Sequence, residues 1–147
     1  MSRRHLITLV GLIAIVLMLG SSPGEAAVAI IANKDVPADT VTKDQLRDIY
    51  MYDVRQWSNM LPVVVLDLTQ KSEIRGAFYG YLGKPASRMK SIWLKKLLLG
   101  EGNPPEVVAD EQAMIARVAE LPGAIGFANA AHIPDSVKVL AIIPSED

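Results

Sequence analysis

The sequence contains no cysteine, only two histidines and few aromatic residues (5%) among its 147 residues. The lack of cysteine excludes disulfides, thiolate metal sites, a cysteine nucleophile and a lipid-bearing cysteine. His5 and His132 are too few for a histidine-paired zinc site, and no G-x-S-x-G turn displays a catalytic serine. A net charge of −1 lacks the basic excess that is typical of nucleic-acid binding. We therefore expect no enzyme, metal, cofactor or nucleic-acid partner; an enzymatic alternative would rest on His132.

The N-terminal segment has the layout of a secretory signal. Arg3 and Arg4 precede a mostly aliphatic stretch from Leu6 to Leu19, and small residues follow in "SSPGEAAVA". Signals have an apolar middle of about 7 to 15 residues, whereas a membrane-spanning helix needs about 20. We expect residues 1–26 to be a signal peptide and 27–147 to be the mature domain, soluble in the periplasm after cleavage. A retained membrane anchor is the alternative.

Hydrophobic patterning along the mature chain alternates between the two periods of secondary structure. Aliphatic runs predict strands, and apolar residues three and four positions apart predict helices. Thr42 and Gln45 form a capping box at a helix start, and Gly83 marks a helix end. The "GEGNPPEVV" segment predicts a loop through its glycine and proline content. The alternation predicts an α/β fold with a small mixed sheet flanked by helices, rather than a bundle or an all-β fold. The predicted strands cover 28–33, 62–68, 121–127 and 137–143, and the predicted helices 42–52, 72–82, 85–97 and 110–121.

Three phrases together carry a resemblance to a known family. In "DQLRDIYMYDVRQW", a leucine helix ends in Ile49 and Tyr50, and Trp57 follows a few residues later. "WLKKLLLGEGNPPEVVADEQAMIARVAE" and "LPGAIGFANAAHI" follow in order. All three resemble segments of the periplasmic phosphate-binding proteins of ABC transporters. Tyr52 stands where that family usually has glycine, in a turn where a positive φ is costly for a bulky residue.

The resemblance implies a single periplasmic-binding-protein-like lobe, because family members have two lobes that close over the ligand. It implies an exported, non-enzymatic solute-binding protein that takes phosphate or another oxyanion and works with an ABC transporter or a sensor. The missing lobe leaves a second hypothesis open. In that alternative the chain is a ligand-free interaction or accessory module, which uses the exposed half-cleft to bind a protein or a second copy of itself.

The stretch "LDLTQKSEIRGAFYG" holds the candidate site, where a valine-rich strand meets a helix. In the resembled family this helix opens with Ser-Gly-Thr after an arginine, and only Ser72 keeps that pattern. Hydroxyl, amide and cationic groups nearby still donate hydrogen bonds to anions. Asp67 and Glu73 would repel an anion. The alternative is a capped helix start with solvated Lys71 and Arg75. The predicted ligand-binding residues are Thr69, Gln70, Lys71, Ser72 and Arg75.

Overall fold

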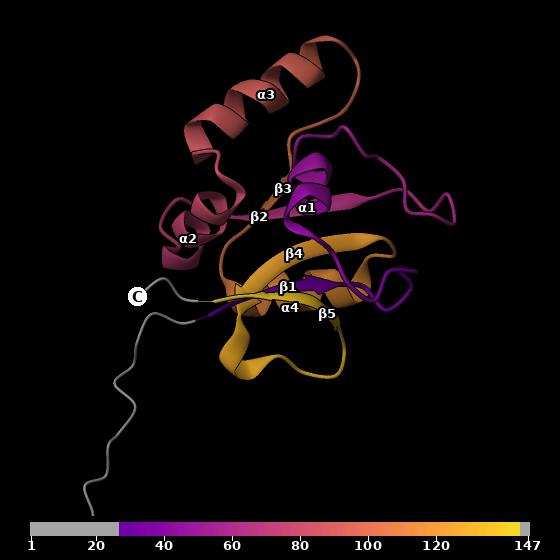
Figure 1. The fold of residues 1–147 in the computed structure, drawn as a ribbon, viewed down its shortest axis with the longest axis vertical. Coiled ribbons are helices and arrows are strands. Elements are labelled where there is room, and N and C mark those ends of the chain that lie inside the picture. The colour runs from indigo at the N-terminus through magenta and orange to yellow at the C-terminus, as the bar shows by residue number, and fades with distance from the viewer. Residues whose placement is uncertain (1–26, 145–147) are drawn as a thin grey trace, which may run out of the picture.

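The computed structural model describes residues 27–144, and Figure 1 shows their arrangement. The predicted signal segment, 1–26, lies outside the described residues. The elements follow in the order β1 (Val28–Ala32), α1 (Lys43–Tyr50), β2 (Val64–Leu68), α2 (Glu73–Leu82), α3 (Ala86–Leu98), β3 (Glu106–Val108), α4 (Glu111–Glu120), β4 (Ala124–Asn129), η1 (Ala130–His132) and β5 (Lys138–Ile143).

Within residues 27–144, five strands form one sheet in the order β3-β2-β4-β1-β5. β2 runs parallel to β3 and β4, whereas β1 runs antiparallel to β4 and β5. The predicted mixed α/β sheet is therefore confirmed. Because β2, β3 and β4 are parallel, their carboxyl ends meet at one edge of the sheet, where ligands gather in open α/β folds.

Helices cover both faces of this sheet. Gly126 and Phe127 are neighbours in β4, so they point to opposite faces. A Cβ atom at Gly126 would overlap the sulfur of Met114 in α4, which shows how closely α4 packs on one face. On the other face the Phe127 ring stacks on Phe78 of α2 with 4.1 Å between ring centroids. The β1 strand between these layers is buried along its whole length.

Several helix ends follow the sequence as predicted. The Gln45 amide donates to Thr42 Oγ1 at 3.1 Å and the Thr42 amide donates to Gln45 Oε1 at 2.9 Å, which completes the capping box. Asp110 caps α4 by accepting from the Ala113 amide at 2.8 Å. Gly83 ends α2 in the left-handed region, with φ 74°.

The turn after α1 keeps a backbone conformation that glycine usually provides. Tyr52 has φ 63°, a region that a bulky side chain enters at a cost. Its ring packs against Gly102, where an added Cβ would stand 3.1 Å from the Tyr52 ring. This contact compensates for the strain, because it covers the aromatic ring with the loop that follows α3.

Two elements lie in segments that the sequence predicted as loops. Glu106–Val108 is the edge strand β3, paired with Leu66–Leu68 of β2, so the prediction of a loop there is wrong. Three residues are too few to show a period-two pattern, and this strand forms only because β2 supplies its partner. The other is η1, a short 3-10 turn that ends at the exposed His132. Among residues 27–144, no helix has both the length and the apolar character needed to span a bilayer.

Candidate functional site

The start of α2 is an open helix N-terminus. β2 ends at Leu68, and the Ser72 amide donates to the Thr69 carbonyl at 3.0 Å to close the turn. Ser72 is the N-cap residue, as the capped-helix alternative expected, but its side chain makes no capping hydrogen bond. Within residues 27–144, the first amides of α2 therefore lack a side-chain acceptor, and the Ser72 hydroxyl is not used for capping.

A hollow of about 700 Å³ adjoins this helix start. Thr69, Lys71 and Ser72 line it from the β2–α2 turn, as predicted. The remaining wall comes from residues that were not predicted to bind the ligand, namely Leu68, Glu73, Ile74, Ala109, Asp110, Glu111 and Asn129. The hollow therefore lies at the carboxyl ends of β2, β3 and β4, between the N-termini of α2 and α4.

Carboxylates in this wall are partly engaged. Asp110 caps α4, and Glu111 accepts a short hydrogen bond from the Asn129 amide. Glu73 is exposed at the start of α2, where a negative charge complements the helix dipole. The exposed Lys71 supplies a positive charge at the same turn. The wall therefore offers hydrogen-bond donors for an anion together with negative charges that would repel one.

Asp67 and Arg75 form a buried ion pair behind the helix start. The Arg75 Nε donates to both carboxylate oxygens at 3.1 and 3.2 Å, and Nη2 donates to Oδ2 at 3.0 Å. The Leu68 amide donates to the same carboxylate at 2.9 Å. Arg75 is only 15% exposed, so the expectation that its side chain is solvated is wrong. The pairing also neutralises the Asp67 charge, which sequence reasoning had counted against an anion.

A second hollow, of about 430 Å³, lies on the other side of this pair. Thr69, Gln70 and Arg75 line it together with Asp67. Its other walls are largely apolar and come from the end of β2, from α3 and from the segment around β3: Leu68, Lys90, Trp93, Leu94, Pro104, Pro105 and Val107. The structure therefore divides the predicted site residues between two hollows, with Lys71 and Ser72 in the first, Gln70 and Arg75 in the second, and Thr69 in both.

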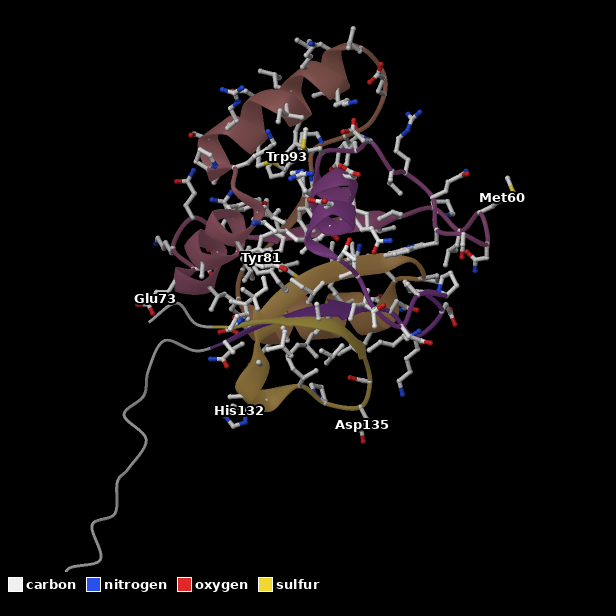
Figure 2. All side chains as sticks on the ribbon, in the orientation of Figure 1. Met60, Glu73, Tyr81, Trp93, His132 and Asp135 are labelled. Carbon is white, nitrogen blue, oxygen red and sulfur yellow. The ribbon has the colours of Figure 1, made fainter. Side chains whose placement is uncertain are left out.

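The large aromatic side chains near these hollows belong to the core. The Tyr50 hydroxyl donates to the Leu66 carbonyl at 2.8 Å, and the Trp93 indole donates to the Tyr50 carbonyl at 2.6 Å. The Trp57 indole donates to the Gly123 carbonyl at 2.9 Å. Figure 2 shows Trp93 inside the fold between α3 and α1, whereas His132 projects from the opposite side of the molecule. His132 lines neither hollow.

Burial raises the pKa of several phenols around Asp67. Desolvation is the main cause for Tyr50, Tyr52 and Tyr79, and the nearby Asp67 carboxylate adds to it. The Tyr79 ring lies 5.1 Å from the Arg75 guanidinium, and its hydroxyl has no hydrogen-bond partner among residues 27–144. Among the same residues, no group of three or more acidic, histidine or cysteine side chains could hold a metal ion.

We expect alkaline pH to destabilise the fold through these phenols. Each has a pKa above its usual value of 10 in the folded state, so above pH 10 the unfolded chain binds fewer protons than the folded chain. Stability is intact below pH 10 and falls above it by about 1.4 kcal/mol per pH unit for each such tyrosine. Urea unfolding at a series of pH values measures this slope. Tyr52→Phe should make the slope shallower by the contribution of one proton, about 1.4 kcal/mol per pH unit. The prediction would be contradicted if all phenols of the folded protein titrated near pH 10.

Comparison with known structures agrees with a single binding-protein lobe. No protein-family model matches the sequence. A protein described as a phosphate ABC transporter substrate-binding protein with bound phosphate, from Clostridium perfringens, has a TM-score of 0.65 and 22% identity, over 78% of this chain and 45% of its own. An ABC-type phosphate transport receptor from Vibrio cholerae has a TM-score of 0.62 and 21% identity, over 78% of this chain and 46% of its own. PstS from Borrelia burgdorferi has a TM-score of 0.60 and 12% identity, over 79% of this chain and 47% of its own.

The chain spans under half the length of these solved structures. The expected resemblance to one lobe of a phosphate-transport binding protein is thus confirmed at the level of the fold. At such low identity the likeness concerns the fold, and what this chain binds has to be argued from its own side chains.

Proposed function

We propose that this chain is a non-enzymatic binding protein whose single described lobe holds phosphate or a similar oxyanion at the start of α2. The observation that carries the proposal is the open N-terminus of α2, which faces a hollow at the carboxyl ends of parallel strands. Free amides at a helix start and the positive end of its dipole favour an anion. The phosphate-binding protein that shares this fold supports the choice of ligand class.

The charges around the turn determine how strong such a site can be. Because Arg75 neutralises Asp67, the charges that line the hollow are those of Lys71, Glu73, Asp110 and Glu111, one positive against three negative. The donors left for an anion are the α2 amides, the Lys71 ammonium and the Thr69 and Ser72 hydroxyls. Gln70 and Arg75 line the second hollow instead. With one side of the ligand open to water, we expect an affinity of about 1 mM, near −4 kcal/mol.

The proposal includes where the protein works. The basic start, aliphatic middle and small-residue end of residues 1–26 support export. An exported lobe with this fold would act in the periplasm beside an ABC transporter or a sensor. A binding role requires no catalytic group, and His132, the residue on which an enzymatic alternative would rest, is exposed on η1 and lines neither hollow.

Calorimetry of the protein with phosphate and sulfate tests the site. We expect Lys71→Gln to weaken phosphate binding about tenfold, because a charged hydrogen bond contributes roughly 1.5 kcal/mol or more. Lys84→Gln is the matched control, because Lys84 lies beyond the opposite end of α2. It should leave the affinity unchanged.

The absence of heat with phosphate and sulfate at ten times the expected dissociation constant would overturn the oxyanion site. The same would follow if Lys71→Gln and Lys84→Gln weakened binding equally, since a diffuse charge effect would then explain the signal. In either case the alternative, a ligand-free interaction module that binds a protein or a second copy, would replace it. Light scattering over a range of protein concentrations would then show whether the partner is another copy.

A further inference from the structure

The C-terminal half of α3 exposes a cluster of leucines that no other element of residues 27–144 covers. Leu98 is 78% exposed, Leu99 60% and Leu94 54%, and Leu97 is also exposed. We call Leu94, Leu97, Leu98 and Leu99 the leucine tip. Soluble surfaces seldom gather large apolar side chains in this way without a partner.

The position of α3 makes these side chains protrude. The helix lies at one end of the long axis of the molecule, and its C-terminal end and the following turn are outermost (Figure 1). Its buried residues are Met89 and Trp93, and the Trp93 indole ties the helix to the Tyr50 carbonyl. The leucine tip is therefore a convex projection that is attached to the rest of the fold from one side.

The charge of α3 has one sign. From Ala86 to Leu98 the helix carries Arg88, Lys90, Lys95 and Lys96 and no acidic residue. Lys96 pairs with Asp53 and Glu101. Arg88, Lys90 and Lys95 make no ion pair among residues 27–144, so they are available to an external negative charge.

Helical spacing places the apolar and basic groups on the same outward side. Leu94 and Leu98 are four residues apart and lie one above the other. By the same spacing Lys90 continues this row towards the start of α3, and Lys95 lies beside it, three residues before Leu98. An apolar strip bordered by lysines is typical of helices that lie in the interface of an anionic membrane.

We propose that the leucine tip docks on an anionic lipid surface, with Leu98 and Leu99 entering the headgroup region and Lys90 and Lys95 facing lipid phosphates. A second copy of the chain is disfavoured as the partner, because two α3 helices packed together would bring like charges into contact. A peptide is disfavoured because the most exposed leucines lie on a protruding helix end rather than in a groove. The surface is separate from the hollow at the start of α2, since no residue that lines that hollow belongs to α3.

Vesicle sedimentation tests this docking surface. The core of residues 27–144 runs from Val28 to Ile143, so a chain that starts at Ala27 keeps this whole core and avoids the aliphatic N-terminal stretch. We expect it to bind vesicles of phosphatidylglycerol and phosphatidylcholine in equal parts, and to bind pure phosphatidylcholine vesicles at least about tenfold more weakly. Leu98→Ser with Leu99→Ser should lower binding to the mixed vesicles about tenfold. The double substitution Lys90→Glu with Lys95→Glu should also lower binding to the mixed vesicles about tenfold, and the remaining binding should not depend on the salt concentration.

The matched control is Ile142→Ser, which removes a similarly exposed aliphatic side chain from β5 and should leave vesicle binding unchanged. Circular dichroism and thermal unfolding should show that all variants keep the fold, because the altered side chains are exposed. Absence of binding to the mixed vesicles would overturn the proposal, and so would equal loss in Ile142→Ser. A dimer that forms without vesicles and disappears in the leucine variant would overturn it in favour of a protein partner. Phosphate calorimetry on the leucine variant should match the wild type, so the two proposals fail independently.

Discussion

Replacement of Arg75 by methionine is expected to lower the free energy of unfolding by about 3 to 5 kcal/mol, measured by urea denaturation. The Asp67 carboxylate is 1% exposed, and Arg75 supplies the fork of donors that compensates its charge. Methionine keeps most of the packing volume but leaves the carboxylate with the Leu68 amide as its remaining partner. A buried charge without its counter-charge costs far more than an exposed one.

Two further variants make this prediction specific. Arg88→Met removes an arginine from the exposed surface of α3 and should change stability by less than about 0.5 kcal/mol. Arg75→Met combined with Asp67→Asn should recover a large share of the loss, because the uncompensated charge is gone. If Arg75→Met were as mild as Arg88→Met, the carboxylate would have to reach water, and the buried pair would be wrong.

The pairing of Asp67 with Arg75 could not be predicted from the sequence. The two residues are eight positions apart across a strand, a turn and a helix start, so neither the strand period nor the helix period relates them. Sequence reasoning treated Asp67 as a source of repulsion and, in the capped-helix alternative, Arg75 as solvated. The geometry of the Thr69–Ser72 turn folds one onto the other, and that geometry is not encoded in residue spacing.

Most of the helices and strands could be predicted from the sequence, because the residues that specify them lie close together in the chain. The capping box of Thr42 and Gln45 and the left-handed end at Gly83 lie within one or two turns of the chain and were predicted correctly. β3 was missed because its stability comes from β2, a distant segment.

For the candidate site, the carboxyl end of β2 was predictable from the strand-then-helix order. The contributions of Glu111 and Asn129 depend on the pairing of β2 with β4 and on where α4 packs.

The turn before β4 provides the other large expected effect. Gly123→Ala should lower the free energy of unfolding by about 3 kcal/mol or more. Gly123 has φ 79°, and an added Cβ would overlap the Pro62 carbonyl oxygen. The Gly123 carbonyl accepts from the Trp57 indole at 2.9 Å and from the Val64 amide at 3.0 Å. A shift of this residue would therefore disturb the start of β2 as well as its own turn.

Substitutions at two other glycines distinguish the cost of backbone strain from the cost of the overlap with the Pro62 carbonyl. Gly83 has φ 74° and nothing within 4 Å of an added Cβ, so Gly83→Ala should cost only the backbone strain, about 1 to 2 kcal/mol. Gly80 lies inside α2 with ordinary helical φ and equal space, so Gly80→Ala should stabilise the protein by about 0.5 to 1 kcal/mol. Thermal and urea unfolding of the three variants should rank Gly123→Ala as the least stable and Gly80→Ala as the most stable. Equal losses at Gly123 and Gly83 would mean that the Pro62 carbonyl yields easily, and that the turn is held by the glycine conformation rather than by close packing.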